Sequence, residues 1–437
     1  MKIAFYLNNE QLEGLDWTHV LTGNPGAGGT EFMVVLEACL MSKEKVHEVV
    51  LYVSKQSVFP DGMNIKYVSC LKEAINDANA NFTDYIVYKE TQKDGEFSFL
   101  KNIPQYTGHI VWCHNFLSKK ALDLYATENV VKSVICVGRE MLDLYRDEKC
   151  FSKMDYIYNG CILPDITKLP KRLENIKLRQ NIVTYIGSIV PSKSFHWLAK
   201  AWPNVLKRVP DAQLYVIGSG NLYDKNAKLG KYGVASEEYE RLFMPFLTNN
   251  AGDVLPSVHF MGKMGEEKKE IIKKTKVGVP NPSGESETFG ITAVEMQSLG
   301  CHVVTMKCPG YLDTVINKDN LYSKPYSLSS YIVNGLINPN DDFQQTYTLL
   351  RERFAYSVVH KDWLRLLAAL KKGKCRIHDL DHDIPNLEYE HKWLRVIMGI
   401  VNRLCSYKLP TELKLKGNRL YCKYNWYKKK LSYYLVK

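Results

Sequence analysis

Residues 280–295 read PNPSGESETFGITAVE and form the most informative loop of the chain. The loop follows the apolar run Val277–Val279, typical of a buried strand, and leads into the helical pattern Gly290–Leu299. Ligands bind α/β sheets at the carboxyl ends of their strands, where such a loop lies. A helix start there attracts phosphate, and the carboxylates of Glu287 and Glu295 can accept hydrogen bonds from sugar hydroxyls. Without the surrounding Pro-Ser and Phe-Gly, two glutamates at this spacing would indicate only solvated helix charges.

Outward from this loop, short apolar runs alternate with helical patterns along most of the 437 residues. Many runs are continuously apolar, as in strands covered on both faces of a parallel sheet. In the first half we expect a helix at Thr30–Met41 and strands at Lys2–Leu7, Glu48–Val53, Ile65–Ser69, Asp84–Tyr88, His109–Cys113, Ser133–Val137 and Met154–Tyr158. Near residue 180 the pattern restarts, with strands at Ile182–Ile186, Gln213–Ile217, Val258–Met261 and His302–Met306 and helices at Lys193–Arg208 and Glu266–Lys274.

This order predicts an α/β protein with two Rossmann-like, doubly wound domains facing a cleft, plus a basic C-terminal helical extension. Residues 166–178 (ITKLPKRLENIKL) are polar and are interpreted as the linker. We therefore expect an N-terminal domain at residues 1–170 and a C-terminal domain at 171–355. A crossover helix and a basic amphipathic extension would follow at 356–437.

The net charge of +11 is concentrated in one segment. Residues 391–437 hold 12 Lys and Arg and one acid, Glu412, so the 390 residues before them are neutral in sum. A nucleic-acid-binding body is disfavoured, because such domains carry their basic patch on the fold itself. The 11 cysteines are scattered without a C-x-x-C pair, which favours free thiols in the cytoplasm. No signal peptide or membrane span is expected.

Three further turns carry candidate site residues. The glycine-rich stretch 23–31 (GNPGAGGTE), which includes Gly28 and Gly29, can bring backbone N–H groups close to a phosphate, although a plain turn is equally consistent with it. Lys193 in the turn after the strand at 182–186 can neutralise a diphosphate or remain a surface lysine. His114 directly follows a strand and can bond a substrate hydroxyl, donate to a leaving group or be a structural histidine.

In this order, the motifs resemble the retaining GT-B glycosyltransferases of family 4. Glu287 to Glu295, with Phe289-Gly290 between them, fits the E-x7-E signature. The sequences that resemble the family's other motifs are Gly28-Gly29-Thr30-Glu31, Asn159-Gly160, Gly218-Ser219-Gly220 and His259-Phe260-Met261-Gly262. The resemblance covers about residues 1–370 and implies an N-terminal acceptor domain and a C-terminal domain that binds the sugar nucleotide.

The resemblance also implies residue roles. Glu295 would bind the donor ribose, Glu287 would lie by the sugar hydroxyls, and Lys193 would hold the diphosphate. His114 would contact the donor sugar, and Glu287, His114 and Lys193 are our catalytic candidates. The remaining donor-binding candidates are Gly28, Gly29, Gly187, Ser188, Gly218, Lys263, Met264, Phe289, Gly290 and Ile291.

One position departs from the family pattern, because Ser188 stands where the family usually has an arginine beside the diphosphate. Lys263 and Lys307 are both candidates for the missing positive charge. No metal site is expected: Asp379-Leu380-Asp381 and Asp381-His382-Asp383 match a metal-binding Asp-x-Asp only on paper, in a polar loop that reads as a solvated charge run. A site formed by His378, Asp381 and His382 would have no strand or helix to fix it.

The resulting hypothesis is a retaining, metal-independent transferase that needs no cofactor. It would move a sugar from a nucleoside-diphosphate sugar, with UDP-sugar favoured, to a hydroxyl of a glycan or lipid-linked glycan in surface polysaccharide synthesis. Nucleic acid is not expected as a partner. The alternatives are a non-catalytic scaffold and a sugar-nucleotide 2-epimerase. The basic helical pattern 389–405 and the Lys- and Tyr-rich end indicate either peripheral contact with the inner leaflet or packing on the N-terminal domain.

Overall fold

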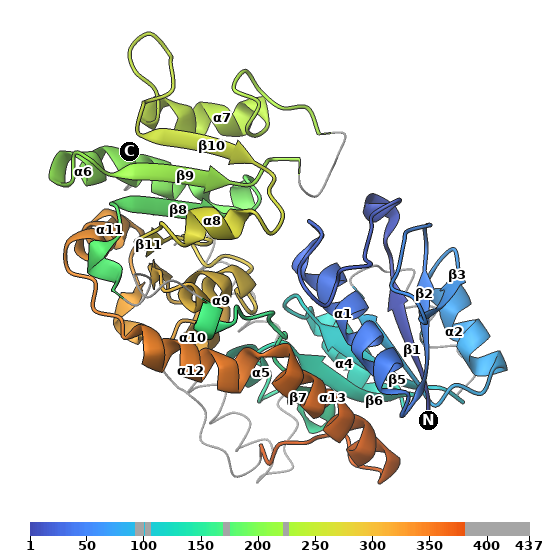
Figure 1. Cartoon of the computed structure of the whole chain (residues 1–437). Coiled ribbons are helices and arrows are strands. Elements are labelled where there is room, and N and C mark those ends of the chain that lie inside the picture. The colour runs from blue at the N-terminus through green and yellow to red at the C-terminus, as the bar shows by residue number, and fades with distance from the viewer. Residues whose placement is uncertain (92–99, 101–105, 169–174, 222–226, 381–437) are drawn as a thin grey trace, which may run out of the picture.

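The computed structural model describes residues 1–91, 100, 106–168, 175–221 and 227–380. These residues form two α/β domains, each built on a parallel sheet (Figure 1). The expected helix at 389–405, and with it the basic C-terminal extension, lies outside the described residues.

The N-terminal domain has a seven-stranded parallel sheet in the order β3-β2-β1-β4-β5-β6-β7. Its strands are β1 (Lys2–Leu7), β2 (Glu48–Val53), β3 (Asn64–Tyr67), β4 (Tyr85–Lys89), β5 (Gly108–Cys113), β6 (Val131–Cys136) and β7 (Met154–Tyr156). Its helices are α1 (Gly29–Glu44), α2 (Leu71–Ala80), α4 (Lys119–Thr127) and α5 (Arg139–Asp143). All six residues of β5 are buried, as a strand covered on both faces requires.

The C-terminal domain has a five-stranded sheet in the order β10-β9-β8-β11-β12, and a separate β13-β14 pair. Its strands are β8 (Ile182–Ile186), β9 (Gln213–Ile217), β10 (Val258–Gly262), β11 (Val277–Gly278), β12 (His302–Val303), β13 (Thr305–Met306) and β14 (Leu321–Tyr322). Its helices are α6 (Phe195–Arg208), α7 (Glu237–Phe243), α8 (Lys268–Ile272), α9 (Ile291–Ser298), α10 (Pro309–Thr314) and α11 (Leu328–Ile337).

Two expected elements are interrupted. The helix expected at 193–208 begins at Phe195, because Ser194 has a left-handed φ of 49° and Lys193 ends a separate turn, Pro191–Lys193. The single strand expected at 302–306 is instead two strands that belong to different sheets. The second difference arises from pairing with distant strands, which the local apolar pattern does not report.

After α12 (Phe343–Phe354), the chain returns to the N-terminal domain as α13 (Tyr356–Lys371), which runs along the bottom of the view in Figure 1. The rings of Trp363 and Trp112 lie 4.6 Å apart, and His360 Nδ1 lies 2.7 Å from Glu37 Oε1. At the crossing, the N–H of Cys161 donates to the carbonyl of Phe354 at 2.6 Å, and the N–H of Tyr356 donates to that of Cys161 at 3.1 Å.

The segment after α13 also packs on the N-terminal domain. The ring of His378 stacks on Tyr156, and its Nδ1 lies 2.8 Å from Oδ1 of Asp155. His378 is therefore an anchoring side chain rather than part of a solvated charge run, while Asp381, His382 and Asp383 lie outside the described residues. Within the described part of the chain, all nine cysteines are free, and no helix has the length and apolarity to span a bilayer.

Candidate active site

A cavity of about 330 Å³ lies between the domains, where four strands of the two sheets end. Gly187 follows β8, Gly218 follows β9, Lys263 follows β10 and His114 follows β5, as expected for ligand sites of parallel sheets. The cavity is lined by all the catalytic and donor-binding candidates from the sequence, namely Gly28, Gly29, His114, Gly187, Ser188, Lys193, Gly218, Lys263, Met264, Glu287, Phe289, Gly290, Ile291 and Glu295.

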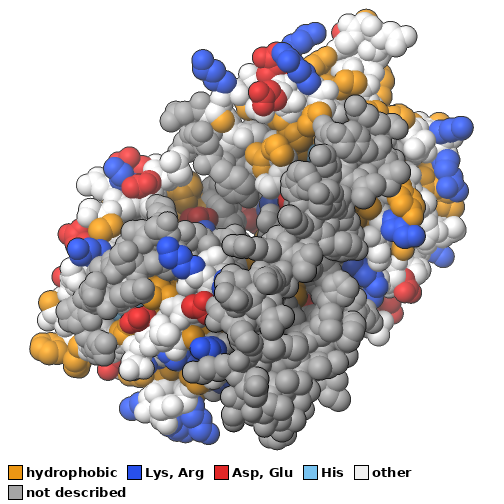
Figure 2. Space-filling view, turned by 180° about the vertical axis from the view of Figure 1, so that it is seen from behind, with side chains coloured by type: hydrophobic (Ala, Val, Ile, Leu, Met, Phe, Trp, Pro, Cys, Tyr) orange, Lys and Arg blue, Asp and Glu red, His pale blue; other side chains and the backbone are white. Residues whose placement is uncertain are grey.

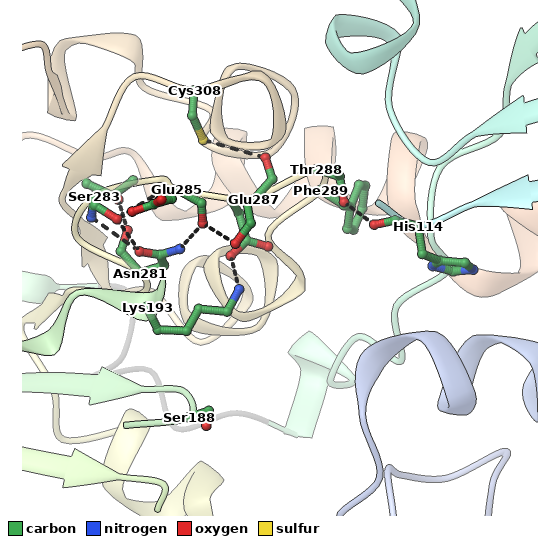
Figure 3. A network of polar contacts seen from close by, with 12 residues as sticks. His114, Ser188, Lys193, Asn281, Ser283, Glu285, Glu287, Thr288, Phe289 and Cys308 are labelled. Atoms are coloured by element: carbon green, nitrogen blue, oxygen red, sulfur yellow. Dashed lines mark hydrogen bonds and ion pairs between the residues drawn. The ribbon is translucent and has the colours of Figure 1, made fainter. Parts of the chain in front are cut away.

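The loop that carries Glu287 is held by its own side chains. Asn281 Nδ2 donates to the carbonyl of Glu285 at 2.8 Å, and the hydroxyl of Ser283 donates to Asn281 Oδ1 at 3.0 Å (Figure 3). Gly290 ends the loop with a φ of +86° and caps α9, and a Cβ there would lie 2.5 Å from the ring of Tyr311. Only glycine fits this turn without strain, and the turn directs the start of α9 into the cavity.

Glu287 and Lys193 form an ion pair across the cavity floor. Lys193 Nζ lies 3.0 Å from Glu287 Oε2, and the two side chains are 21% and 16% exposed (Figure 3). Because both are partly shielded, this pair interacts more strongly than a surface pair. The turn that displaces Lys193 from α6 is what places its ammonium group beside the loop of Glu287.

Glu295 forms a second ion pair, with Lys268 of α8. Lys268 Nζ lies 3.1 Å from each carboxylate oxygen. Burial opposes the charge of Lys268, yet the charge and hydrogen bond of Glu295 outweigh it and raise the pKa of Lys268. The sequence analysis missed Lys268, because it lies in a lysine-rich run with no pattern that marks it.

His114 enters the cavity from the N-terminal domain. Its ring lies 4.8 Å from that of Trp112, and its Nε2 is buried with no hydrogen-bond partner among the residues that the structure describes. Burial lowers the pKa of His114 to about 3, with a smaller contribution from Lys89. The imidazole is therefore neutral at neutral pH, which suits hydrogen bonding to a hydroxyl and opposes its use as a charged acid.

The backbone of this loop is fixed on both sides. The N–H of His114 donates to Glu90 Oε2 at 2.8 Å, and Asn115 Nδ2 donates to Glu90 Oε1 at 2.6 Å. From the other domain, Thr288 Oγ1 donates to the carbonyl of His114 at 2.6 Å. The sequence analysis missed Glu90, Asn115 and Thr288, which only the fold brings to His114.

Two glycine turns allow backbone to come close to the cavity. Gly28 caps α1, where a Cβ would lie 2.3 Å from Glu31 Oε2, and Gly29 is the first residue of that helix. Gly218 has a φ of +140°, and a Cβ there would lie 1.8 Å from the carbonyl oxygen of Gly187. No other residue fits at Gly218 without backbone movement.

The lysine candidates for the missing arginine differ in position. Ser188 is 1% exposed, and its hydroxyl donates to the carbonyl of Ser219 at 3.3 Å. Lys263 lines the cavity, with its Nζ 3.1 Å from the carbonyl oxygen of Asn221. Lys307 is absent from the described cavity lining, whereas Lys268, not considered from sequence, is part of it.

Two Rossmann-like domains that close on a cleft at their strand ends define the GT-B fold. Residues 180–345 match the family described as Glycosyl transferases group 1. The chain is thus a glycosyltransferase with the GT-B fold, and the family match falls on the domain that carries both ion pairs.

Three proteins that resemble this chain in sequence or structure share less than a quarter of their aligned residues with it. A protein of Haemophilus influenzae (strain ATCC 51907 / DSM 11121 / KW20 / Rd), described as an uncharacterized glycosyltransferase, is 22% identical over 284 residues, which is 62% of this chain and 72% of that protein. Anabaena HepE, solved in complex with UDP, is 15% identical with a TM-score of 0.57, covering 84% of this chain and 100% of that one. The α,α-trehalose 6-phosphate synthase of Burkholderia multivorans is 10% identical with a TM-score of 0.57, covering 85% and 98%. These structural similarities show the fold.

Proposed function

We propose that the chain is a retaining, metal-independent glycosyltransferase that moves a sugar from a nucleoside-diphosphate sugar, with UDP-sugar favoured, to a glycan or lipid-linked glycan hydroxyl. The observation that carries the proposal is the pair of carboxylates on the C-terminal domain, each matched to a lysine, on either side of the start of α9. This arrangement suits a ligand with a diphosphate between two groups of hydroxyls. The UDP bound to HepE supports the same donor class.

Different residues would bind different parts of the sugar-nucleotide donor. Glu295 would accept the ribose hydroxyls, and the start of α9 with Lys193 would face the diphosphate. Glu287 would lie beside the sugar, and the unpartnered Nε2 of neutral His114 would bond one of its hydroxyls. Lys268 and Lys263 add positive charge to the same surface, where Ser188 supplies none.

In the transfer step, the bond between the anomeric carbon and the diphosphate oxygen breaks. The acceptor oxygen forms the new bond from the same face, and its proton passes to the departing diphosphate. Lys193 and the N–H groups at the start of α9 would stabilise the negative charge that develops on the leaving group. These groups are fixed before the reaction, which is the condition for electrostatic catalysis.

The proposal also includes a lipid-linked acceptor and contact of the chain with a membrane surface. The neutral body and strongly basic residues 391–437 support peripheral contact of 389–437 with an anionic inner leaflet. Figure 2 agrees with a neutral body, because basic and acidic side chains are interspersed among the described residues of that face. A lipid-linked acceptor would be presented at such a surface.

One observation favours a non-catalytic scaffold, namely the uncharged and buried Ser188 at the arginine position. An epimerase would need additional carboxylates from the N-terminal domain. The described cavity lining from that domain consists of Asn24, Gly26, Ala27, Gly28, Gly29, Thr30, Phe32, His114, Asn115 and Asn159. That lining favours the transferase over the epimerase.

The test is a panel of UDP-, GDP-, ADP- and dTDP-sugars with and without EDTA, measuring nucleoside diphosphate release and thermal shift. We expect one donor to be selected and EDTA to have no effect. Glu287→Ala should then lower release by about 1000-fold, whereas Glu285→Ala, an exposed carboxylate of the same loop, should have little effect. A flat response from folded protein, or full activity of Glu287→Ala, would contradict the proposal.

A further inference from the structure

Thr288 forms a direct hydrogen bond between the two domains inside the candidate site. Its hydroxyl donates to the carbonyl oxygen of His114 at 2.6 Å. Thr288 is 6% exposed and His114 is 7% exposed, so water does not compete for this bond in the closed cleft. Figure 3 shows the bond reaching from the loop of Glu287 across to His114.

The carbonyl of His114, which accepts this hydrogen bond, is held in position by contacts within the N-terminal domain. Glu90 is 5% exposed and holds both the N–H of His114 and the side chain of Asn115. Two acceptor oxygens of one carboxylate thus fix consecutive residues of the loop. Thr288 meets a carbonyl whose direction is already set.

The side that donates this hydrogen bond, Thr288, is equally constrained. The preceding residue, Glu287, pairs with Lys193, and the ring of the following residue, Phe289, packs 5.4 Å from that of Phe354. The hydroxyl of Thr288 therefore lies at a fixed point of the loop. A shift of the Thr288 backbone would also move that of Glu287, because the two residues share a peptide bond.

The hydroxyl acts only when the cleft is closed. If the domains separate, water can satisfy both the hydroxyl and the carbonyl of His114. When the cleft closes, the buried carbonyl needs a protein donor, and Thr288 supplies it. The bond thus joins the loops of Glu287 and His114, and both of these residues line the cavity.

Two other sets of hydrogen bonds join the domains through residues other than Thr288 and His114. The N–H of Asn24 donates to Glu266 Oε1 at 3.1 Å, where Glu266 is partly exposed and also pairs with Lys269. Asp313 accepts from the N–H of Glu140 and from the hydroxyl of Tyr158. Neither contact involves the backbone of His114, although Tyr158 also packs on Phe289, with 6.2 Å between the rings.

We propose that Thr288 is a positioning residue whose hydroxyl fixes the loop of Glu287 against that of His114 when the domains close. This inference rests on the proposed function, since it assigns Thr288 to the same transfer reaction. Replacing Thr288 by valine would keep every charged group of the cavity lining and the volume of the side chain, and would remove the hydrogen bond to His114.

The experiment compares Thr288→Val with Thr288→Ser on the donor that the wild type selects. Thr288→Val should lower kcat about 10- to 30-fold while the Kd for UDP, measured by calorimetry, changes less than threefold. Thr288→Ser, which keeps the hydroxyl, should restore most of kcat. Small-angle scattering should give a larger radius of gyration for Thr288→Val than for the wild type and Thr288→Ser in saturating UDP.

Thr275→Val is the matched control. Thr275 is also buried in the C-terminal domain, and its hydroxyl donates to the carbonyl of Ile271 at 3.0 Å, outside the cavity lining. We expect Thr275→Val to lower thermal stability without changing kcat or the radius of gyration. An equal fall in kcat for Thr275→Val and Thr288→Val would overturn the proposal, because it would show a general structural effect.

The experiments distinguish a failure of the proposed function from a failure of the positioning role of Thr288. If the wild type transfers no sugar from any donor, the proposed function is wrong, and the scattering comparison still tests the contact of Thr288. If the wild type is active, and Thr288→Val has the same kcat and the same radius of gyration as the wild type, the positioning role is wrong and the proposed function stands.

Discussion

The two sides of the cavity differ in charge. The C-terminal side carries Lys193, Lys263, Lys268, Glu287 and Glu295. Among described residues, the N-terminal side carries glycine backbone, amide side chains and a neutral imidazole. The first side suits a charged ligand such as a diphosphate, and the second suits neutral hydroxyls. The two sides thus differ in the groups that they offer to a ligand, with paired charges on the C-terminal side and uncharged hydrogen-bonding groups on the N-terminal side.

Lys193→Met should show the largest effect, because it removes a cation from the charged side and leaves Glu287 unpaired. We expect kcat/KM to fall by about 100- to 1000-fold, as when a preorganised charge-stabilising group is lost. Steady-state kinetics with the selected donor measure it. Lys200→Met, a lysine of α6 outside the cavity lining, is the control. Equal effects of the two variants would contradict the assignment.

Two buried histidines of the N-terminal domain, His109 and the cavity residue His114, predict a dependence of stability on pH. Burial lowers the pKa of His109 to about 4 and that of His114 to about 3, against 6.5 for an ordinary histidine. Their stabilising contribution is present above pH 6.5 and is lost as pH falls, because the unfolded chain binds protons first. As the pH falls from 6.5 to 5, each of the two histidines should lower the free energy of unfolding by about 1.5–2 kcal/mol.

Urea unfolding at several pH values measures this loss. Burial raises the pKa values of Glu37 and Glu90, and those groups act in the opposite direction, so one histidine must be isolated. His109→Gln should reduce the slope between pH 5 and 6 by about 1.4 kcal/mol per pH unit. An unchanged slope would mean that His109 does not remain neutral in the folded protein.

Lys268→Met should have the smallest of the three effects. Removing this ammonium group takes one positive charge from the donor-binding surface, although Lys193 and Lys263 remain. We expect UDP to bind about tenfold more weakly, which corresponds to about 1.4 kcal/mol. Calorimetry at low and high salt measures it, and the difference from wild type should shrink at high salt. Tighter binding of UDP by the variant would refute this role.

The sequence predicted most strands and the residues that gather at the cavity, because buried parallel strands are continuously apolar and site residues follow their ends. Expected strands at Lys2–Leu7, Ile182–Ile186 and Gln213–Ile217 agree with β1, β8 and β9. The roles of the site residues remain predictions, since geometry alone does not test them.

What the sequence did not reveal depends on contacts between distant segments. Lys268 is one lysine among several until Glu295 lies beside it, and Thr288 gains its role only from the carbonyl of His114. His378 looked like part of a charged loop, yet Asp155 and Tyr156 hold it. No local pattern encodes these pairings, because each joins segments more than 20 residues apart.

The crossing at Cys161 has a consequence for how often the cavity can assemble. The two chain segments that connect the domains hydrogen-bond to each other there, through Cys161, Phe354 and Tyr356. Two connections that meet at one place limit how far the domains can separate. The side that bears His114 is therefore held at a high effective concentration near the side that bears Glu287. Most of the entropy that bringing the two sides together would cost is therefore lost when the chain folds, before a ligand binds.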